Sequence, residues 1–238
     1  MEFENAGPAG AWADYVAARL IARVVEHPSL RLVLPTGLTP LPVYDRVAQA
    51  VARGAVSFAR TEIFLLDEFG GVSADDPGRC DQMLVRAFVS RVDVAPGGFH
   101  RFTLNGDIDA ECRRYEALIG DGCDLAIFGI GTNGHLGMNE PGSPADGLTR
   151  RVDLAPSTIA ASARYFGRET HLPTWGVTLG LGTLGRSREI WILASGAAKA
   201  AIVRDTRHAP VSPGIPSTLL RPHAGARLIA DEEAAALA

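Results

Sequence analysis

The chain has 238 residues, of which 47% are hydrophobic, so it is long enough to bury a large core within one α/β domain. Its 23 basic and 27 acidic residues give a net charge of -4 with no basic run, which excludes the charge pattern of a nucleic-acid-binding protein. No apolar stretch reaches the roughly 18 residues of a membrane-spanning helix, and the acidic start is unlike a secretory signal. We therefore expect a cytoplasmic protein without a nucleic-acid or membrane partner.

The first half of the chain predicts alternating helices and strands, from the spacing of its apolar residues. In chain order these elements are a helix at 12–25, a strand at 32–34, a helix at 41–51, a strand at 63–66, a long loop rich in Gly, Asp and Pro at 67–79, and a helix near 82–92.

The second half continues this alternation around a less regular stretch at 143–172. Its predicted elements are a helix at 107–119 with Asp107 as N-cap, strands at 125–130, 151–154, 175–179 and 190–193, a helix at 197–204 and a last strand at 227–230. The pattern predicts a single domain over residues 1–238, with a three-layer α/β/α fold built on a mostly parallel, Rossmann-like sheet.

The segment DLAIFGIGTNGHLGMNEPG is the most informative stretch, because an apolar strand opens there into a glycine turn. Gly131 and Gly134 let the backbone bend sharply and approach a ligand closely. Asn133, His135 and Glu140 place an amide, an imidazole and a carboxylate at the carboxyl end of the strand, where open α/β sheets bind their ligands. An imidazole suits proton transfer near neutral pH, so His135 is a candidate acid–base group.

A second candidate for proton transfer is Asp67, which follows four apolar residues at a predicted strand end. Burial there is expected to raise its pKa from the usual value near 3.9 toward the working range of a base. The alternative is that Asp67 is a cap or turn residue. Its neighbour Glu68 could be merely structural.

Two features predict a phosphate site. Thr36, Gly37, Leu38 and Thr39 lie between a strand and a helix, so their backbone N–H groups and two hydroxyls can face an anion, although an ordinary turn would look alike. Lys199 is the only lysine among 23 basic residues and starts a helix after a strand. Chance explains one leftover lysine in an arginine-rich chain, whereas a phosphate site explains its position.

Cys80, Cys112 and Cys123 are odd in number and lack the CxxC spacing of zinc or redox sites, so we expect reduced thiols. The alternative is a cysteine nucleophile, for which the sequence shows no local signature. The sequence also shows no cluster with metal-ligand spacing.

Several ordered motifs, from about residue 10 to residue 230, resemble the glucosamine-6-phosphate deaminase family. The family patterns [GT]-G-[SGT]-T-P, [LM]-D-E-[YF] and G-[IV]-G-x-[ND]-G-H-[IL]-x-[FM]-N-E-P correspond to Thr36–Pro40, Leu66–Phe69 and Gly129–Pro141. The resemblance implies a NagB-like fold and implies that Arg164 and Lys199 bind the same phosphate. Leu38 departs from the small residue usual at its position.

The resemblance also implies an activity. A 2-amino-2-deoxy-hexose 6-phosphate, glucosamine 6-phosphate first among them, would be converted to a ketose 6-phosphate and ammonia. His135, positioned by Glu140, would open the sugar ring, and Asp67 would move a proton from C2 to C1. No metal or redox cofactor is needed for this chemistry. Asn133 stands where relatives have Asn or Asp.

Two rival functions remain open. A 6-phosphogluconolactonase-like hydrolase would share the fold and the phosphate loop, although Phe69 and the NEP sequence favour the deaminase. A sugar-phosphate sensor without catalysis would keep only the binding site.

Other departures bear on substrate and assembly. Many relatives have Pro-x-Ser-Tyr where this chain has Pro77-Gly-Arg79-Cys80; Arg79 either meets an anionic sugar or, as we expect, faces solvent. Val152 replaces a basic residue of regulated members, so allosteric activation is not expected. Family members range from single chains to hexamers, which leaves a homo-oligomer open.

Overall fold

The computed structural model describes residues 1–167 and 171–238. Over these residues the core is a seven-stranded sheet in the order β1-β10-β9-β6-β2-β3-β5, and each neighbouring pair is parallel. Its strands are β1 (Glu2–Asn5), β2 (Arg31–Leu34), β3 (Glu62–Leu65), β5 (Phe99–His100), β6 (Leu125–Gly129), β9 (Glu189–Ala194) and β10 (Ala226–Ala230). The predicted α/β class with a mostly parallel sheet is confirmed.

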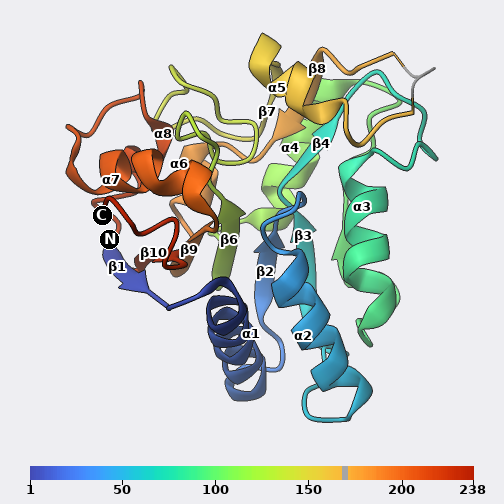
Figure 1. The fold of residues 1–238 in the computed structure, drawn as a ribbon. Coiled ribbons are helices and arrows are strands. Elements are labelled where there is room, and N and C mark those ends of the chain that lie inside the picture. Colours follow the sequence, from blue (N-terminus) through green and yellow to red (C-terminus); the bar gives the residue numbers. More distant parts are fainter. Residues whose placement is uncertain (168–170) are drawn as a thin grey trace.

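Helices flank this sheet, and Figure 1 shows α1 and α2 side by side against the central strands. The longer helices are α1 (Ala9–Glu26), α2 (Leu41–Ala52), α3 (Cys80–Ala87), α4 (Ile108–Ile119) and α7 (Ala200–His208). The short ones are α5 (Pro156–Ser162), α6 (Leu181–Leu184) and α8 (Pro216–Leu219), with 3-10 turns at Val89–Arg91 and Ala197–Lys199. Asp107 caps α4 as predicted, because its side chain accepts a hydrogen bond from the N–H of Ala110 at 3.0 Å.

A second, antiparallel sheet lies beyond the carboxyl ends of the central strands (Figure 1), in the order β4-β8-β7. Its strands are β4 (Asp67–Phe69), β7 (Arg150–Asp153) and β8 (Trp175–Thr178). The prediction of a loop at 67–79 is therefore wrong for its first three residues, which form a strand paired with β8. Three residues are too few to show the alternating period of a strand. The pairing holds Asp67 opposite Thr178 in a regular sheet.

Other differences from the prediction concern short or marginal elements. Helix α3 begins at Cys80 and not near 82, and a 3-10 turn follows its end at Ala87. The predicted pattern omits β1 and β5, which lie at the two edges of the sheet. Both pair with strands from other parts of the chain, so no local sequence signal marks them.

The apolar core lies between the sheet and its helices. Trp12 of α1 is buried against the sheet and donates a hydrogen bond from its indole Nε1 to the carbonyl of Ile229 at 3.1 Å. Burial of each such large side chain stabilises the fold by about 1.5–3 kcal/mol. Among the described residues, no helix is both long enough and apolar enough to cross a bilayer.

Candidate active site

A cavity of about 660 Å³ opens at the carboxyl ends of β2, β3, β6 and β9. The predicted site residues that line it are Thr36, Gly37, Leu38, Thr39, Asp67, Gly131, Asn133, His135, Arg164 and Lys199. The loops that follow parallel strands all emerge at one edge of the sheet, so residues far apart in sequence meet there. Gly134 and Glu140 belong to the same turn but are not among the residues that line the cavity.

One end of the cavity is cationic and rich in N–H donors. The loop from Thr36 to Thr39 joins β2 to α2, and Gly37 adopts a φ of +93°, which only glycine takes without strain. Arg164 and Lys199 line the same space. Burial lowers the pKa of the Lys199 ammonium, and the nearby Arg164 guanidinium lowers it further. Two cations that repel each other across a cavity are well placed to share one dianion.

Asp67 is buried at the wall of the cavity, with 8% of its surface exposed. Burial raises the pKa of its carboxyl from 3.8 to about 7, although the nearby Cys80 thiol lowers it in part. Gly137 approaches so closely that a Cβ there would lie 3.1 Å from Asp67 Oδ2. A carboxyl with this pKa can both accept and return a proton near neutral pH.

The His135 ring is oriented by Asn133. Its Nδ1 lies 2.7 Å from Asn133 Oδ1, and an amide oxygen only accepts, so Nδ1 carries the proton and Nε2 keeps its lone pair. Burial lowers the pKa of His135; Glu140 raises it and Lys199 lowers it. The ring lies over Gly131, where a Cβ would be 2.2 Å from His135 Cε1. The imidazole is therefore a neutral base of fixed tautomer.

Glu140 acts on His135 mainly through Asn133. Its Oε2 is 3.6 Å from His135 Nδ1 but accepts a hydrogen bond from Asn133 Nδ2 at 2.9 Å. Thr158 of α5 donates its hydroxyl to the other carboxylate oxygen. The result is a chain of hydrogen bonds in which Asn133 connects the Glu140 carboxylate to the His135 imidazole.

Gly134 serves the shape of the turn. It has a φ of +84°, and a Cβ there would lie 2.6 Å from Ile215 Cγ2, so the turn can pack against the chain before α8 only with glycine. It does not line the cavity, unlike Gly131.

Arg79 corrects one sequence expectation. The side chain does not face solvent: it is 5% exposed and forms ion pairs with Glu68 and Asp81. The adjacent Cys80 lines the cavity, and sequence reasoning left its role open. Both residues follow a loop whose path the sequence does not reveal.

The described residues include no group of His, Cys, Asp and Glu side chains that could hold a metal ion. The cavity instead combines three kinds of group: an N–H-rich cationic end, a buried carboxyl of raised pKa and an imidazole of fixed tautomer. Such a set can anchor an anionic compound and move protons at its other end.

Comparisons with known proteins agree with these features. A family model described as glucosamine-6-phosphate isomerases/6-phosphogluconolactonase matches residues 5–229. The glucosamine-6-phosphate deaminase of Geobacillus sp. (strain WCH70) is 37% identical over 223 residues, which cover 92% of this chain and 88% of the relative. That of Mycolicibacterium smegmatis is 38% identical over 230 residues, which cover 95% of this chain and 88% of the relative.

Solved structures give the same result. A monomeric glucosamine-6-phosphate deaminase matches with a TM-score of 0.95 at 32% identity, over the whole of both chains. A 6-phosphogluconolactonase from Thermotoga maritima matches with a TM-score of 0.75 at 21% identity, over 97% of this chain and 98% of that one, a likeness of fold alone. The resemblance that the motifs indicate is confirmed.

Proposed function

The chain belongs to the glucosamine-6-phosphate isomerase/6-phosphogluconolactonase family, and on this premise we propose that it converts glucosamine 6-phosphate and water to fructose 6-phosphate and ammonia. The observation that carries the proposal is the buried Asp67 carboxyl, with a pKa of about 7, in one cavity with His135 and the cationic end. Because these residues come from both halves of the chain, residues 1–238 act as one domain.

The phosphate of the substrate binds at the cationic end. Backbone N–H groups of the Thr36–Thr39 loop, the ammonium of Lys199 and the guanidinium of Arg164 neutralise the dianion. Anchoring the C6 end fixes where C1 and C2 lie, so binding energy far from the reacting atoms is used to orient them.

Ring opening is the task of His135. With its proton on Nδ1, the imidazole accepts the proton of the anomeric hydroxyl at Nε2 and delivers it to the ring oxygen as the C1–O5 bond breaks. The transient positive charge on the imidazole ring is stabilised by Glu140 through Asn133. The product is the open-chain aldehyde.

Isomerisation is the task of Asp67. Its carboxylate takes the proton from C2 and the electron pair forms a C1–C2 double bond, while O1 takes up a proton from solvent in place of one that the C2 ammonium releases. The same carboxyl then returns the proton to C1, which leaves an imine at C2. Water adds to that imine and ammonia leaves, so the oxidation levels of C1 and C2 exchange with no redox cofactor.

The proposed partner of the site is a small-molecule sugar phosphate. The residues assigned to its binding and conversion form one cavity within a single chain. The relative with the TM-score of 0.95 is itself described as monomeric. We therefore propose that catalysis does not require association of copies.

A two-readout assay separates this proposal from the lactonase alternative. Purified protein is incubated with glucosamine 6-phosphate and, separately, with a 6-phosphogluconolactone, and ammonia and acid are followed independently. We expect ammonia and fructose 6-phosphate from the first substrate. Acid from the lactone without ammonia from the amino sugar would contradict the proposal, and binding of either compound without turnover would favour a sensor.

A further inference from the structure

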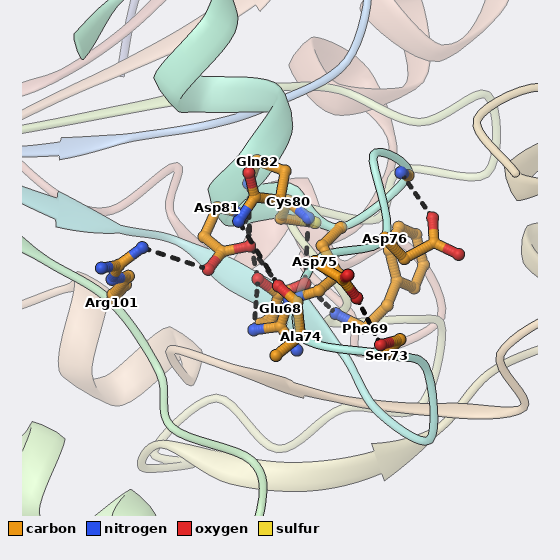
Figure 2. A network of polar contacts seen from close by, with 12 residues as sticks. Glu68, Phe69, Ser73, Ala74, Asp75, Asp76, Cys80, Asp81, Gln82 and Arg101 are labelled. Carbon is orange, nitrogen blue, oxygen red and sulfur yellow. Dashed lines mark hydrogen bonds and ion pairs between the residues drawn. The ribbon is translucent and has the colours of Figure 1, made fainter. Parts of the chain in front are cut away.

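A buried charge network at the start of α3 has no part in the mechanism above. Glu68 of β4 is 0% exposed, and its carboxylate accepts hydrogen bonds from three backbone N–H groups. These belong to Phe69 at 2.8 Å, Cys80 at 2.9 Å and Asp81 at 2.9 Å (Figure 2). The last two groups lie in the first turn of α3, where a helix attracts negative charge. Glu68 therefore ties β4 to the beginning of this helix.

Arg79 balances the charge of this carboxylate. Its Nη2 lies 3.2 Å from Glu68 and its Nε 3.0 Å from Asp81. Burial and the nearby Asp81 carboxylate raise the pKa of Glu68 above its usual value, whereas Arg79 and the backbone N–H groups of Asp81 and Cys80 offset this rise in part. Without Arg79 that pKa rises further, and a protonated carboxyl would turn an O–H toward backbone N–H groups. The first turn of α3 would then lose its anchor.

The first residue of α3 is the direct neighbour of the base. Burial keeps the pKa of the Cys80 thiol well above its usual value, so the thiol stays protonated. Cys80 and Asp67 line the same cavity, and the nearby thiol lowers the pKa of Asp67 in part. Thr36, the first residue of the Thr36–Thr39 loop, lines the same cavity. The position of α3 thus determines the polar partner of the Asp67 carboxylate.

We propose that Arg79 is a positioning residue for the acid–base chemistry of this site: paired with Glu68, it fixes the first turn of α3 and so keeps the Cys80 thiol beside Asp67 in the cavity wall. The proposal rests on the proposed function, in which Asp67 is the base. Arg79 does not line the cavity, so it acts through Glu68 and Cys80 and not on the substrate.

The test combines kinetics with the reactivity of the three cysteines. Arg79→Met removes the charge and Arg79→Lys keeps it. Arg101→Met is the matched control, because Arg101 lies 3.7 Å from Asp81 in the same network but its side chain is 55% exposed. For each protein we measure kcat and KM for glucosamine 6-phosphate, and the rate at which iodoacetamide labels each cysteine, resolved by peptide mass spectrometry.

Arg79→Met is expected to lower kcat at least about tenfold and to leave KM within about threefold, because the phosphate anchor is unchanged. Cys80 should be labelled faster, while Cys112 and Cys123, which are also buried, keep their slow rates. Arg79→Lys should retain most of kcat, and Arg101→Met should match the wild type in both measurements.

Unchanged kcat or an unchanged Cys80 rate in Arg79→Met would overturn the proposal. Faster labelling of all three cysteines together would also overturn it, because the loss would then be general loosening of the fold. If Arg79→Met does not fold, Arg79→Gln takes its place under the same criteria. If the wild type itself releases no ammonia, the proposed function fails, and the Cys80 rate alone decides whether Arg79 fixes α3.

Discussion

In the proposed mechanism, the Asp67 carboxyl takes a proton from one carbon and returns it to the next, which requires a pKa close to the working pH. The structure supplies this by burial at a strand end, which raises the pKa to about 7. His135 is kept neutral in a different way, because burial lowers its pKa, while Asn133 fixes its tautomer. The two groups in one cavity are thus suited to the separate tasks that the proposed mechanism gives them.

The role of Lys199 can be tested with two substitutions. Lys199→Ala removes one of two cations from the phosphate end, so KM should rise about ten- to a hundredfold with a small effect on kcat. Lys199→Arg tests whether the site requires the compact ammonium of lysine or whether the lysine stands there by chance. A KM like that of Lys199→Ala indicates that the guanidinium does not fit, whereas a wild-type KM in Lys199→Arg indicates that either cation serves. A wild-type KM in Lys199→Ala contradicts a phosphate role.

Among the elements, the turn after β6 depends on close contacts that only glycine allows. Gly131→Ala should lower kcat at least about tenfold, because the new Cβ would meet the His135 ring at 2.2 Å. Steady-state kinetics with glucosamine 6-phosphate measures this. Gly106→Ala is the control, since nothing lies within 4 Å of a Cβ there. Equal kcat values in the two variants would show that the position of the ring does not limit turnover.

At the scale of helices and strands, the sequence predicts those elements whose own apolar residues show the pattern, such as α1 and β6. It does not predict β4, whose three residues become a strand only through pairing with β8, more than 100 residues later. Arg79 looks like a surface arginine in sequence for the same reason: its partner Glu68 is brought to it by the sheet and not by the local chain. Candidate residues at strand ends are predictable, whereas contacts between loops are not.

At the scale of the whole molecule, the buried Asp67 carboxyl makes the free energy of unfolding depend on pH. The pKa of Asp67 is higher in the folded protein, about 7, than the ordinary value of 3.8, so the fold binds this proton more tightly than the unfolded chain does. The contribution of the protonated carboxyl to the free energy of unfolding is fully present below pH 3.8 and is lost as pH rises through 7. Above neutrality the buried charge destabilises the fold by up to about 4 kcal/mol.

Asp67→Asn should therefore melt at a higher temperature than the wild type at pH 8, because the amide carries no charge at any pH. The difference in Tm should shrink steadily as pH falls and be smallest near pH 4. Thermal unfolding in a series of buffers measures it. A difference in Tm that does not vary with pH would show that Asp67 is not the titrating group.

The whole-molecule account depends on the assignment of Asp67 as the proton carrier between C2 and C1, and kinetics of Asp67→Asn with glucosamine 6-phosphate tests it most directly. Ammonia release is measured as a function of substrate concentration at neutral pH. We predict that kcat falls by about 10³-fold or more while KM stays within about threefold, because the substitution removes a base and almost no volume. A kcat close to that of the wild type would contradict the account.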